Sequence, residues 1–324
     1  QNVRNSRLNR LMQLLQIRGR NLTAAEERYA QSWLDMGMEE ELISLAYERT
    51  CLNTGGLNWA YMNKILQRWH SQGLHTGEEV RTGDQRSNIP KGASGQLGNE
   101  LRTVLAQGSG ELGPIPEKLL HATVIGTDVT AAPGVEALDI TDRHQVAVFL
   151  RRMQPDVVIN CAAYTNVNGC ETHQADAYKV NALGPRNLAM ACDEIGAKLV
   201  HVSTDYVFSG EGDVPLCEYD TVGPVSVYGK TKRAGEEYVQ QFCKKHFIVR
   251  TAWLYGEGKN FVRTILRVAK ERGKVTVVND QFGNPTSTVD LAHHMLKIAD
   301  GAPYGIYHAT NNGVCSWYEF AKEF

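Results

Sequence analysis

Two different hydrophobic patterns follow one another along this chain, and they restrict its fold more than any other feature. Up to about Gly83 the apolar residues recur at helical spacing, as Tyr61, Ile65 and Trp69 do, and no stretch alternates as a strand would. From Ala122 onward, short apolar runs alternate with helical stretches. Such alternation is typical of a doubly wound parallel sheet. The sequence therefore predicts a separate all-α helical module followed by an α/β unit.

Composition places few other limits on the chain. It has 324 residues, a formal net charge of -2 and 42% hydrophobic residues, which gives no sign of a strongly charged surface for a polyanion. No run approaches the roughly eighteen apolar residues that cross a bilayer. The 7 cysteines include no Cys-x-x-Cys pair and are therefore interpreted as reduced thiols. We expect a cytoplasmic protein with no membrane contact.

Individual elements can be assigned from the same patterns. Thr23 with Glu26 forms a capping-box signature at the start of a helix, and Thr76 with Glu79 repeats it. In the second part, apolar runs predict strands over residues 123–126, 157–161, 198–202, 247–251, 275–278 and 306–309. The helical stretches between them include residues 143–153, 175–194 and 230–242.

A glycine-rich segment stands between the two parts. Residues 84–91 are interpreted as a polar linker, and Gly92, Gly95 and Gly98 follow it with the spacing G-x-x-G-x-x-G. A helical stretch comes next, so the N–H groups of this turn suit the pyrophosphate of a dinucleotide, as in a Rossmann-type sheet. Further on, Asp128 is a candidate acceptor for a ribose 2'-hydroxyl, which would favour NADH. The alternative is a flexible glycine linker that binds nothing.

Tyr228 and Lys232 are the candidate proton donor and its partner. They stand four residues apart and share a face of a helix, where the lysine is expected to lower the pKa of the phenol toward neutrality. A second Tyr-x-x-x-Lys pair begins at Tyr318, so the spacing alone decides nothing. Only Tyr228 follows a predicted strand, residues 199–202, that leads into Thr204 at the ligand-binding edge of a parallel sheet. Tyr318 is assigned to packing or to the surface.

Five motifs in order give the second part a specific family resemblance. They are Asn160-Cys161-Ala162-Ala163-Tyr164-Thr165, Ser203-Thr204-Asp205-Tyr206-Val207-Phe208, Tyr228-Gly229-Lys230-Thr231-Lys232, Arg250-Thr251-Ala252-Trp253-Leu254-Tyr255 and Asp280-Gln281-Phe282-Gly283-Asn284-Pro285-Thr286. Together they resemble the motif set of dTDP-4-dehydrorhamnose reductases, which are nucleotide-sugar reductases of the short-chain dehydrogenase type. The resemblance covers residues 92–324 and implies a Rossmann-type sheet with a small substrate-binding region.

The resemblance also implies roles for particular residues, with Thr204, Tyr228 and Lys232 as the catalytic triad. The implied cofactor is NADPH or NADH, bound by Gly92, Gly95, Gln96, Leu97, Gly98, Asp139, Ile140, Ala162, Ala163, Tyr164, Tyr228 and Lys232. The implied dTDP-sugar substrate is dTDP-4-dehydro-6-deoxy-L-mannose, reduced at its C4 ketone in dTDP-L-rhamnose biosynthesis. It would lie near Thr165, Val167, Thr204, Asp205, Trp253 and Thr286. No metal site is predicted, and a homodimer is left open.

The second part departs from the family pattern at three places. Asn168 stands where the family carries an acidic residue. Residues 86–91 supply one apolar side chain, Ile89, and a proline where a buried strand should precede the glycines. Residues 316–324 read as the start of a helix that the family continues. The reductase-like part, residues 92–324, is therefore expected to lack its first strand and its C-terminal end.

The helical part has a resemblance of its own. Leu42-Ile43 with Ala46, Tyr61-Met62-Asn63-Lys64-Ile65-Leu66-Gln67-Arg68-Trp69 and Gly73-Leu74-His75-Thr76 are similar to the DnaD-type module of bacterial replication-initiation proteins. This implies a DNA or replication-initiation partner for residues 1–83, and Arg4, Arg7, Arg10, Arg18 and Arg20 would suit a phosphate backbone. The alternative is a solvated helical surface, because residues 1–83 carry 10 basic and 9 acidic side chains.

Three functional hypotheses follow from these observations. The first is an active reductase. The second is a DNA-associated helical module fused to an inactive reductase remnant, which the missing first strand favours. The third is a nucleotide-binding regulatory subunit of the same fold, against which the triad of Thr204, Tyr228 and Lys232 argues. The join at residues 91–95 is interpreted as a fusion of two unrelated coding segments.

Overall fold

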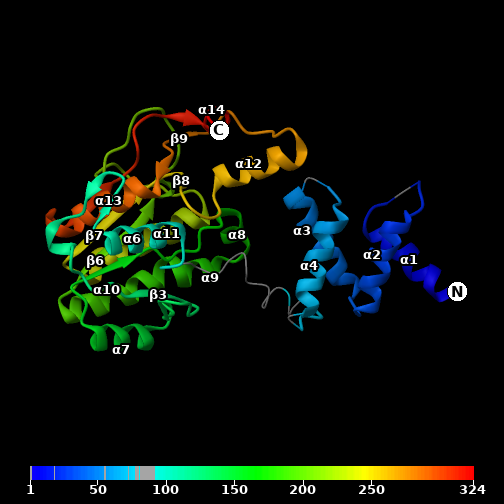
Figure 1. The fold of residues 1–324 in the computed structure, drawn as a ribbon, viewed down its shortest axis with the longest axis horizontal. Helices are drawn as coiled ribbons and strands as arrows, with labels where there is room; N and C mark the ends of the chain where they lie inside the picture. Colours follow the sequence, from blue (N-terminus) through cyan, green and yellow to red (C-terminus); the bar gives the residue numbers. More distant parts are fainter. Residues whose placement is uncertain (1, 18, 55, 72, 77–79, 81–91) are drawn as a thin grey trace. The chain divides into compact units, whose positions relative to one another are not determined.

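The chain forms two compact units in the computed structural model, Gln1–Ser87 and Asn88–Phe324 (Figure 1). The structure describes residues 2–17, 19–54, 56–71, 73–76, 80 and 92–324. The predicted linker at 84–91, the missing first strand assigned to it and the second capping box at Thr76 and Glu79 fall wholly or partly outside these residues. Within them, no helix is both long and apolar enough to cross a bilayer.

The first unit is helical, as its periodicity predicts. Its helices are α1 (Asn2–Leu14), α2 (Ala24–Asp35), α3 (Glu40–Thr54) and α4 (Trp59–Ser71). Residues at helical spacing form one core, in which Trp33, Leu42, Met62, Leu66 and Trp69 are each fully buried. Trp33 and Trp69 are therefore packing residues, and the ring of Trp33 stacks on that of Trp59 at 5.2 Å, whereas Tyr61 of α4 is 38% exposed.

The start of α2 forms the predicted capping box. The Glu26 N–H donates to the Thr23 hydroxyl at 3.3 Å, and the Thr23 N–H donates to the Glu26 carboxylate at 2.8 Å. These two bonds satisfy donors that the first turn of a helix otherwise leaves unpaired.

The second unit is built on a parallel sheet in the order β11-β7-β6-β5. These strands are β5 (Val157–Asn160), β6 (Lys198–Thr204), β7 (His246–Thr251) and β11 (Gly305–His308), all within a few residues of prediction. Helices α7 (Arg143–Met153), α10 (Gly184–Ile195) and α11 (Val227–Phe242) pack on one face, and α6 (Gln96–Gln107) and α13 (Thr288–Gly301) pack on the other. The doubly wound α/β prediction is confirmed.

The central strands are apolar on both faces, which explains the two helical layers. Leu199 and Ile248 belong to the core that α7, α10 and α11 cover, whereas Val200, Phe247 and Val249 belong to the core that α6 and α13 cover. Successive side chains of a strand point to opposite faces, so apolar runs that do not alternate with polar residues require a layer on each side.

A second, smaller parallel pair stands apart from this sheet. It consists of β3 (Gly126–Asp128) and β4 (Val135–Ala137). In the part of the chain that the structure describes, β5 pairs only with β6 and β3 pairs only with β4. The prediction of a strand over residues 123–126 is corrected, because pairing begins only at Gly126.

Short elements complete the unit. They are β1 (Ser109–Gly110) with β2 (Gly113–Pro114), η1 (Glu117–Leu119), α8 (Val167–Thr172), α9 (Gln174–Tyr178), the π-helix η2 (Lys179–Leu183), η3 (Asp205–Val207), β8 (Leu254–Tyr255), α12 (Phe261–Arg272), β9 (Phe282–Gly283), β10 (Thr286–Ser287), β12 (Cys315–Ser316) and α14 (Trp317–Lys322). β8 pairs with β10, and β9 pairs with β12.

Two further expectations about elements are corrected. The predicted helix over residues 175–194 is divided into α9, η2 and α10, because Pro185 near the start of α10 has no N–H to continue the helical bonding. The predicted strand over residues 275–278 does not form. Its valines favour an extended backbone, but among the described residues no strand pairs with them.

Limited proteolysis is expected to cut the chain first between Thr82 and Pro90. This segment is polar in sequence and joins two units that have separate cores, so little buried backbone should protect it. Mass spectrometry of the earliest fragments checks the site. First cleavage between Val157 and Val202, inside the central sheet, would contradict the division into a helical module and a reductase part.

Candidate active site

Tyr228 and Lys232 lie on α11, at the start of which Ser226 acts as the cap. The Ser226 hydroxyl accepts a hydrogen bond from the Gly229 N–H at 3.1 Å, which fixes the first turn that carries Tyr228. One turn later, the Lys232 ammonium donates to the Val202 carbonyl oxygen of β6 at 2.6 Å. Lys232 is only 2% exposed. The helix is thereby attached directly to the central strand.

Thr204 ends β6 at the carboxyl edge of the sheet. Its hydroxyl donates to the Asp205 carboxylate at 2.8 Å and accepts from the Tyr206 N–H at 3.2 Å. The Thr204 side chain also lies near enough to the Tyr228 phenol to lower the pKa of that phenol. Thr204, Tyr228 and Lys232 are therefore brought together at the edge where parallel sheets bind ligands.

The electrostatics of the pair differ from the sequence-based expectation. Burial raises the pKa of Tyr228, and the Thr204 side chain only partly opposes this. The expectation that Lys232 lowers the pKa of the phenol is therefore wrong for this structure, because burial outweighs any effect of the ammonium. Burial also lowers the pKa of Lys232, to about 8. The phenol is neutral near pH 7, the form that can donate a proton.

The glycine loop lies beside β3 and precedes α6, whose N-cap is Gly95. A Cβ atom at Gly98 would collide with the Gly92 carbonyl oxygen. A Cβ atom at Gly92 would come within 2.8 Å of the Thr127 carbonyl oxygen and 3.8 Å of the Ala162 Cβ. Only glycine fits this close approach of two backbone segments, so the turn is a packed element and not a loose linker.

Asp128, at the end of β3, holds the same loop. Its carboxylate accepts hydrogen bonds from the N–H groups of Gly92 and Ser94, both at 3.1 Å, and of Val129 at 2.8 Å. The Ala93 N–H donates to the Thr127 carbonyl oxygen at 3.0 Å. The loop is thus fixed to β3 by both backbone and side-chain bonds.

Gln96 and Leu97, the other two candidates in this loop, differ in exposure. Gln96 donates to the Lys259 carbonyl oxygen at 3.0 Å and accepts from the Asn260 amide at 3.1 Å. Leu97 is 5% exposed, and its side chain packs in the core under α6. Only the backbone of Leu97 is therefore available to contact a ligand.

The candidates after β4 are tied to the ends of neighbouring elements. The Leu138 N–H donates to the Asp128 carbonyl oxygen at 2.8 Å, which places the following residues beside the glycine loop. The Asp139 carboxylate accepts from the N–H and the hydroxyl of Thr141, both at 2.8 Å. The Ile140 side chain packs against the backbone of Gly184 in α10.

The candidates after β5 are only partly accessible. The Ala162 N–H donates to the Asn160 side chain at 3.1 Å, and Ala163 is half-buried. Tyr164 is buried and packs near Tyr228, and burial raises the pKa of its phenol to about 12. The side chain of Tyr164 is therefore a packing residue, and only its backbone can lie along a cofactor.

The predicted substrate side is uneven in exposure. Thr165 is exposed and Val167 is half-buried at the start of α8, while Asp205 is half-buried and burial raises the pKa of its carboxyl. Thr286 is 1% exposed, and its hydroxyl donates to the Asn284 carbonyl oxygen at 3.2 Å. Trp253 has a left-handed backbone, with φ of 42°, and stacks on Trp317 of α14 at 3.5 Å.

Comparisons with known proteins agree with this geometry. The family described as RmlD substrate binding domain matches residues 89–324. The chain belongs to the dTDP-4-dehydrorhamnose reductase family.

Relatives in that family are similar over most of their length. The dTDP-4-dehydrorhamnose reductase of Streptomyces griseus is 44% identical over 239 residues, which are 72% of this chain and 73% of the relative. The solved structure of a dTDP-4-dehydrorhamnose reductase from Clostridium acetobutylicum is 45% identical, with a TM-score of 0.60 over 71% of this chain and 76% of the other. That of the Bacillus anthracis dTDP-4-dehydrorhamnose reductase in complex with NADP is 40% identical, with a TM-score of 0.62 and the same coverage.

A second family, described as replication initiation and membrane attachment, matches residues 11–83. This agrees with the resemblance of the helical part to replication-initiation modules. The arginines proposed to contact DNA are partly engaged within the unit, however. Arg10 pairs with Glu40 at 2.8 Å and Arg20 pairs with Glu26 at 2.7 Å, and Arg20 holds the pKa of Glu26 down at about 2. Arg18 and the side chains of Arg4 and Arg7 lie outside the described part of the chain.

Two residues whose positions the sequence reasoning did not use lie within or just beyond the dTDP-4-dehydrorhamnose reductase motifs. Arg250 opens the fourth motif, and Glu236 continues the four-residue spacing of Tyr228 and Lys232 along α11. Both are buried and form an ion pair. The spacing Tyr-x-x-x-Lys-x-x-x-Glu was visible in the sequence and could have marked Glu236 as a residue of the same helix face.

Proposed function

We propose that residues 92–324 reduce the C4 ketone of dTDP-4-dehydro-6-deoxy-L-mannose to a hydroxyl with NADPH or NADH. The observation that carries this proposal is the meeting of Thr204, Tyr228 and Lys232 at the carboxyl edge of the sheet, in a chain of the dTDP-4-dehydrorhamnose reductase family. The reaction is a step of dTDP-L-rhamnose biosynthesis.

The chemistry of the three side chains supports a ketone reduction. A bound nicotinamide would supply the hydride. The neutral Tyr228 phenol donates its proton to the oxygen on which negative charge develops, and the Thr204 hydroxyl stabilises the same oxygen by a hydrogen bond. Lys232, positioned one turn along α11 by the Val202 carbonyl oxygen, would supply the positive charge that favours the phenolate once the proton has left.

The glycine loop fits a dinucleotide. Gly92 and Gly98 allow the close backbone packing that shapes this turn, and the N-terminus of α6, with Gly95 as its N-cap, would direct N–H groups at a pyrophosphate there. The structural relative from Bacillus anthracis was solved with NADP. These observations support a nicotinamide dinucleotide as the cofactor, with Ala162, Ala163 and the Asp139–Ile140 segment beside it.

The choice between the two cofactors depends on Asp128. Its carboxylate lies at the glycine loop, where a 2'-phosphate would meet a second negative charge. Two like charges about 4 Å apart in water repel by about 1 kcal/mol, which corresponds to roughly fivefold in affinity. We infer a modest preference for NADH.

On the sugar side, we propose contacts from the exposed Thr165, from Val167 at the start of α8 and from Asp205 beside the triad. Trp253 would offer an aromatic edge to the substrate, since one face of its indole is covered by Trp317. Thr286 would act by holding the Trp253 segment, because its N–H donates to the Trp253 carbonyl oxygen at 3.2 Å.

The helical unit supports a second, independent proposal. Its match to a replication-initiation family favours a DNA or initiation-complex partner for residues 11–83. The ion pairs of Arg10 and Arg20 remove two candidate phosphate contacts, so the partner surface would need other residues.

The direct test is turnover of dTDP-4-dehydro-6-deoxy-L-mannose by the purified full chain. We expect loss of the reduced-nicotinamide absorbance with either cofactor, formation of dTDP-L-rhamnose, and a higher kcat/KM with NADH. The same preparation is titrated with NADH and NADPH without sugar. Dinucleotide binding without turnover would favour the regulatory-subunit hypothesis, and no binding at all would favour an inactive reductase remnant.

A further inference from the structure

Helix α11 carries a third charged residue on the face of the proposed active site. Tyr228, Lys232 and Glu236 follow one another at intervals of four residues, so their side chains share one side of the helix. Glu236 has no exposed surface. A buried carboxylate is costly unless it is paired, and the catalytic proposal gives Glu236 no role.

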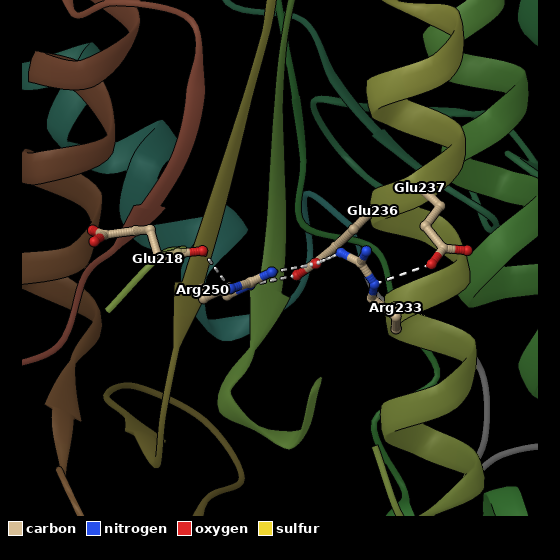
Figure 2. Close-up of polar contacts among 5 residues, drawn as sticks. All are labelled: Glu218, Arg233, Glu236, Glu237 and Arg250. Carbon is tan, nitrogen blue, oxygen red and sulfur yellow. Dashed lines mark hydrogen bonds and ion pairs between the residues drawn. The ribbon is translucent and has the colours of Figure 1, made fainter. Parts of the chain in front are cut away.

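Glu236 accepts a hydrogen bond from Arg233 of its own helix at 3.1 Å, and its buried partner is Arg250 of β7 (Figure 2). The Arg250 guanidinium donates to both carboxylate oxygens of Glu236, at 2.9 and 2.8 Å, and is itself 3% exposed. A third bond runs from Arg250 to the Glu218 carbonyl oxygen at 3.4 Å, and the guanidinium lies 5.1 Å from the centre of the Phe208 ring. This fork-shaped pairing fixes both side chains in direction as well as in distance.

The location of the pair ties α11 to the strands that end at the site. In the register of β7 and β6, Arg250 lies opposite Ser203, and Ser203 immediately precedes Thr204. One helical turn back along α11, Lys232 is attached to Val202 of the same strand. Two consecutive turns of α11 are thus bonded to the strands that end beside Thr204. These bonds fix the position of α11, and therefore of Tyr228, relative to Thr204.

Glu236 also supplies negative charge near Lys232. The other titratable groups that affect Lys232 are Cys161, after β5, and His201, on β6. Burial raises the pKa of Cys161 to about 12 and lowers the pKa of His201 well below its usual range, so both are neutral near pH 7. Burial by itself would raise the pKa of Glu236, but the bonds from Arg250 outweigh it and keep the carboxylate ionised.

We propose that Glu236, held by Arg250, is a positioning residue that keeps Lys232 protonated and in place one helical turn from Tyr228. A catalytic role for this arrangement rests on the proposed ketone reduction. The charge of Lys232 can be measured without any turnover, so the role of Glu236 and the proposed function can fail independently.

The test follows the titration of Lys232 by NMR in the full chain labelled with ¹³C at the lysine ε-carbon. The Lys232 signal is identified as the one that Lys232→Arg removes. In the unsubstituted chain we expect a midpoint near pH 8. Glu236→Gln removes the carboxylate charge that favours the ammonium, so the midpoint should fall by about one pH unit or more.

A neighbouring glutamate offers a matched control. Glu237 lies on the same helix with its side chain 59% exposed, and it shares Arg233 with Glu236, each at 3.1 Å (Figure 2). Glu237→Gln removes the same charge from the solvent side and should leave the Lys232 midpoint unchanged. Glu236→Asp keeps the charge and should shift the midpoint less than Glu236→Gln does.

If Glu236→Gln does not fold, the double variant Glu236→Gln with Arg250→Gln decides, because it leaves neither charge unpaired. It should also lower the Lys232 midpoint. A midpoint that stays near pH 8 in the folded single or double variant overturns the proposal. If the expected shift occurs in a chain that does not reduce the sugar, the role of Glu236 toward Lys232 stands and the proposed function fails.

Discussion

Tyr228→Phe is expected to lower kcat for the 4-keto sugar by roughly two to four orders of magnitude, the usual scale for the loss of a general acid. The substitution removes only the phenolic hydroxyl, which lies on the side of Thr204. The ring would keep its edge-to-face contact with Tyr206, whose centre lies 5.4 Å away. Melting temperature and dinucleotide affinity should therefore change little, and single-turnover kinetics will show whether the reduction step itself is slowed.

Tyr318→Phe is the matched control for this experiment. Tyr318 has the same four-residue spacing to a lysine, but it lies on α14 and is 44% exposed. The Lys322 ammonium lies 5.7 Å from the centre of its ring, an arrangement in which the phenolic hydroxyl has no part. We expect no change in kcat for this variant. An undiminished kcat in Tyr228→Phe would remove Tyr228 from the mechanism.

An apolar strand introduced in place of Ser87 to Lys91 is expected to raise the melting temperature and the NAD(P)H affinity together. A central strand buries about four apolar side chains at roughly 1.5 to 3 kcal/mol each, so its loss removes on the order of 6 to 12 kcal/mol. That is comparable to a total domain stability of about 5 to 15 kcal/mol. Each kcal/mol recovered should raise the melting temperature by about 2–4 °C in a unit of this size.

The position of the glycine loop supports this expectation. Gly92 lies between Thr127 of β3 and Ala162 after β5. Among the described residues these two strands belong to separate sheets. An added strand leading into Gly92 could join them and direct the loop at the pyrophosphate.

Calorimetry and fluorescence titration with NADPH check the strand replacement, with a replacement of equal length made of polar residues as control. A rise in melting temperature without a rise in affinity would show that the strand stabilises the sheet but does not improve dinucleotide binding by the glycine loop. If the unmodified chain already binds NADPH at low micromolar concentration and turns over the sugar normally, the inference of a missing strand is wrong.

The sequence was sufficient to predict what depends on local pattern. Runs such as Val157–Asn160 and His246–Thr251 are apolar and rich in β-branched residues, so their strands were predictable from pattern alone. The helical stretch predicted at residues 230–242 corresponds to α11, which begins three residues earlier, at Val227, and so carries Tyr228 as well as Lys232.

What could not be predicted depends on contacts between distant residues. Residues 275–278 have the composition of a strand, but strand formation needs a partner that the sequence does not specify. The raised pKa of Tyr228 follows from burial by surrounding elements, which spacing to Lys232 does not reveal. The pairing of Glu236 with Arg250 joins a helix to a strand and is likewise a tertiary property.

The carboxylate of Asp128 acts on the glycine loop as a built-in hydrogen-bond acceptor. Because it already binds the N–H groups of Gly92 and Ser94, the loop has a reason to keep its shape between one ligand and the next. A loop that is ordered in advance loses less conformational entropy when a dinucleotide arrives. The cost is competition, since any ligand oxygen that needs those two N–H groups must first displace the carboxylate.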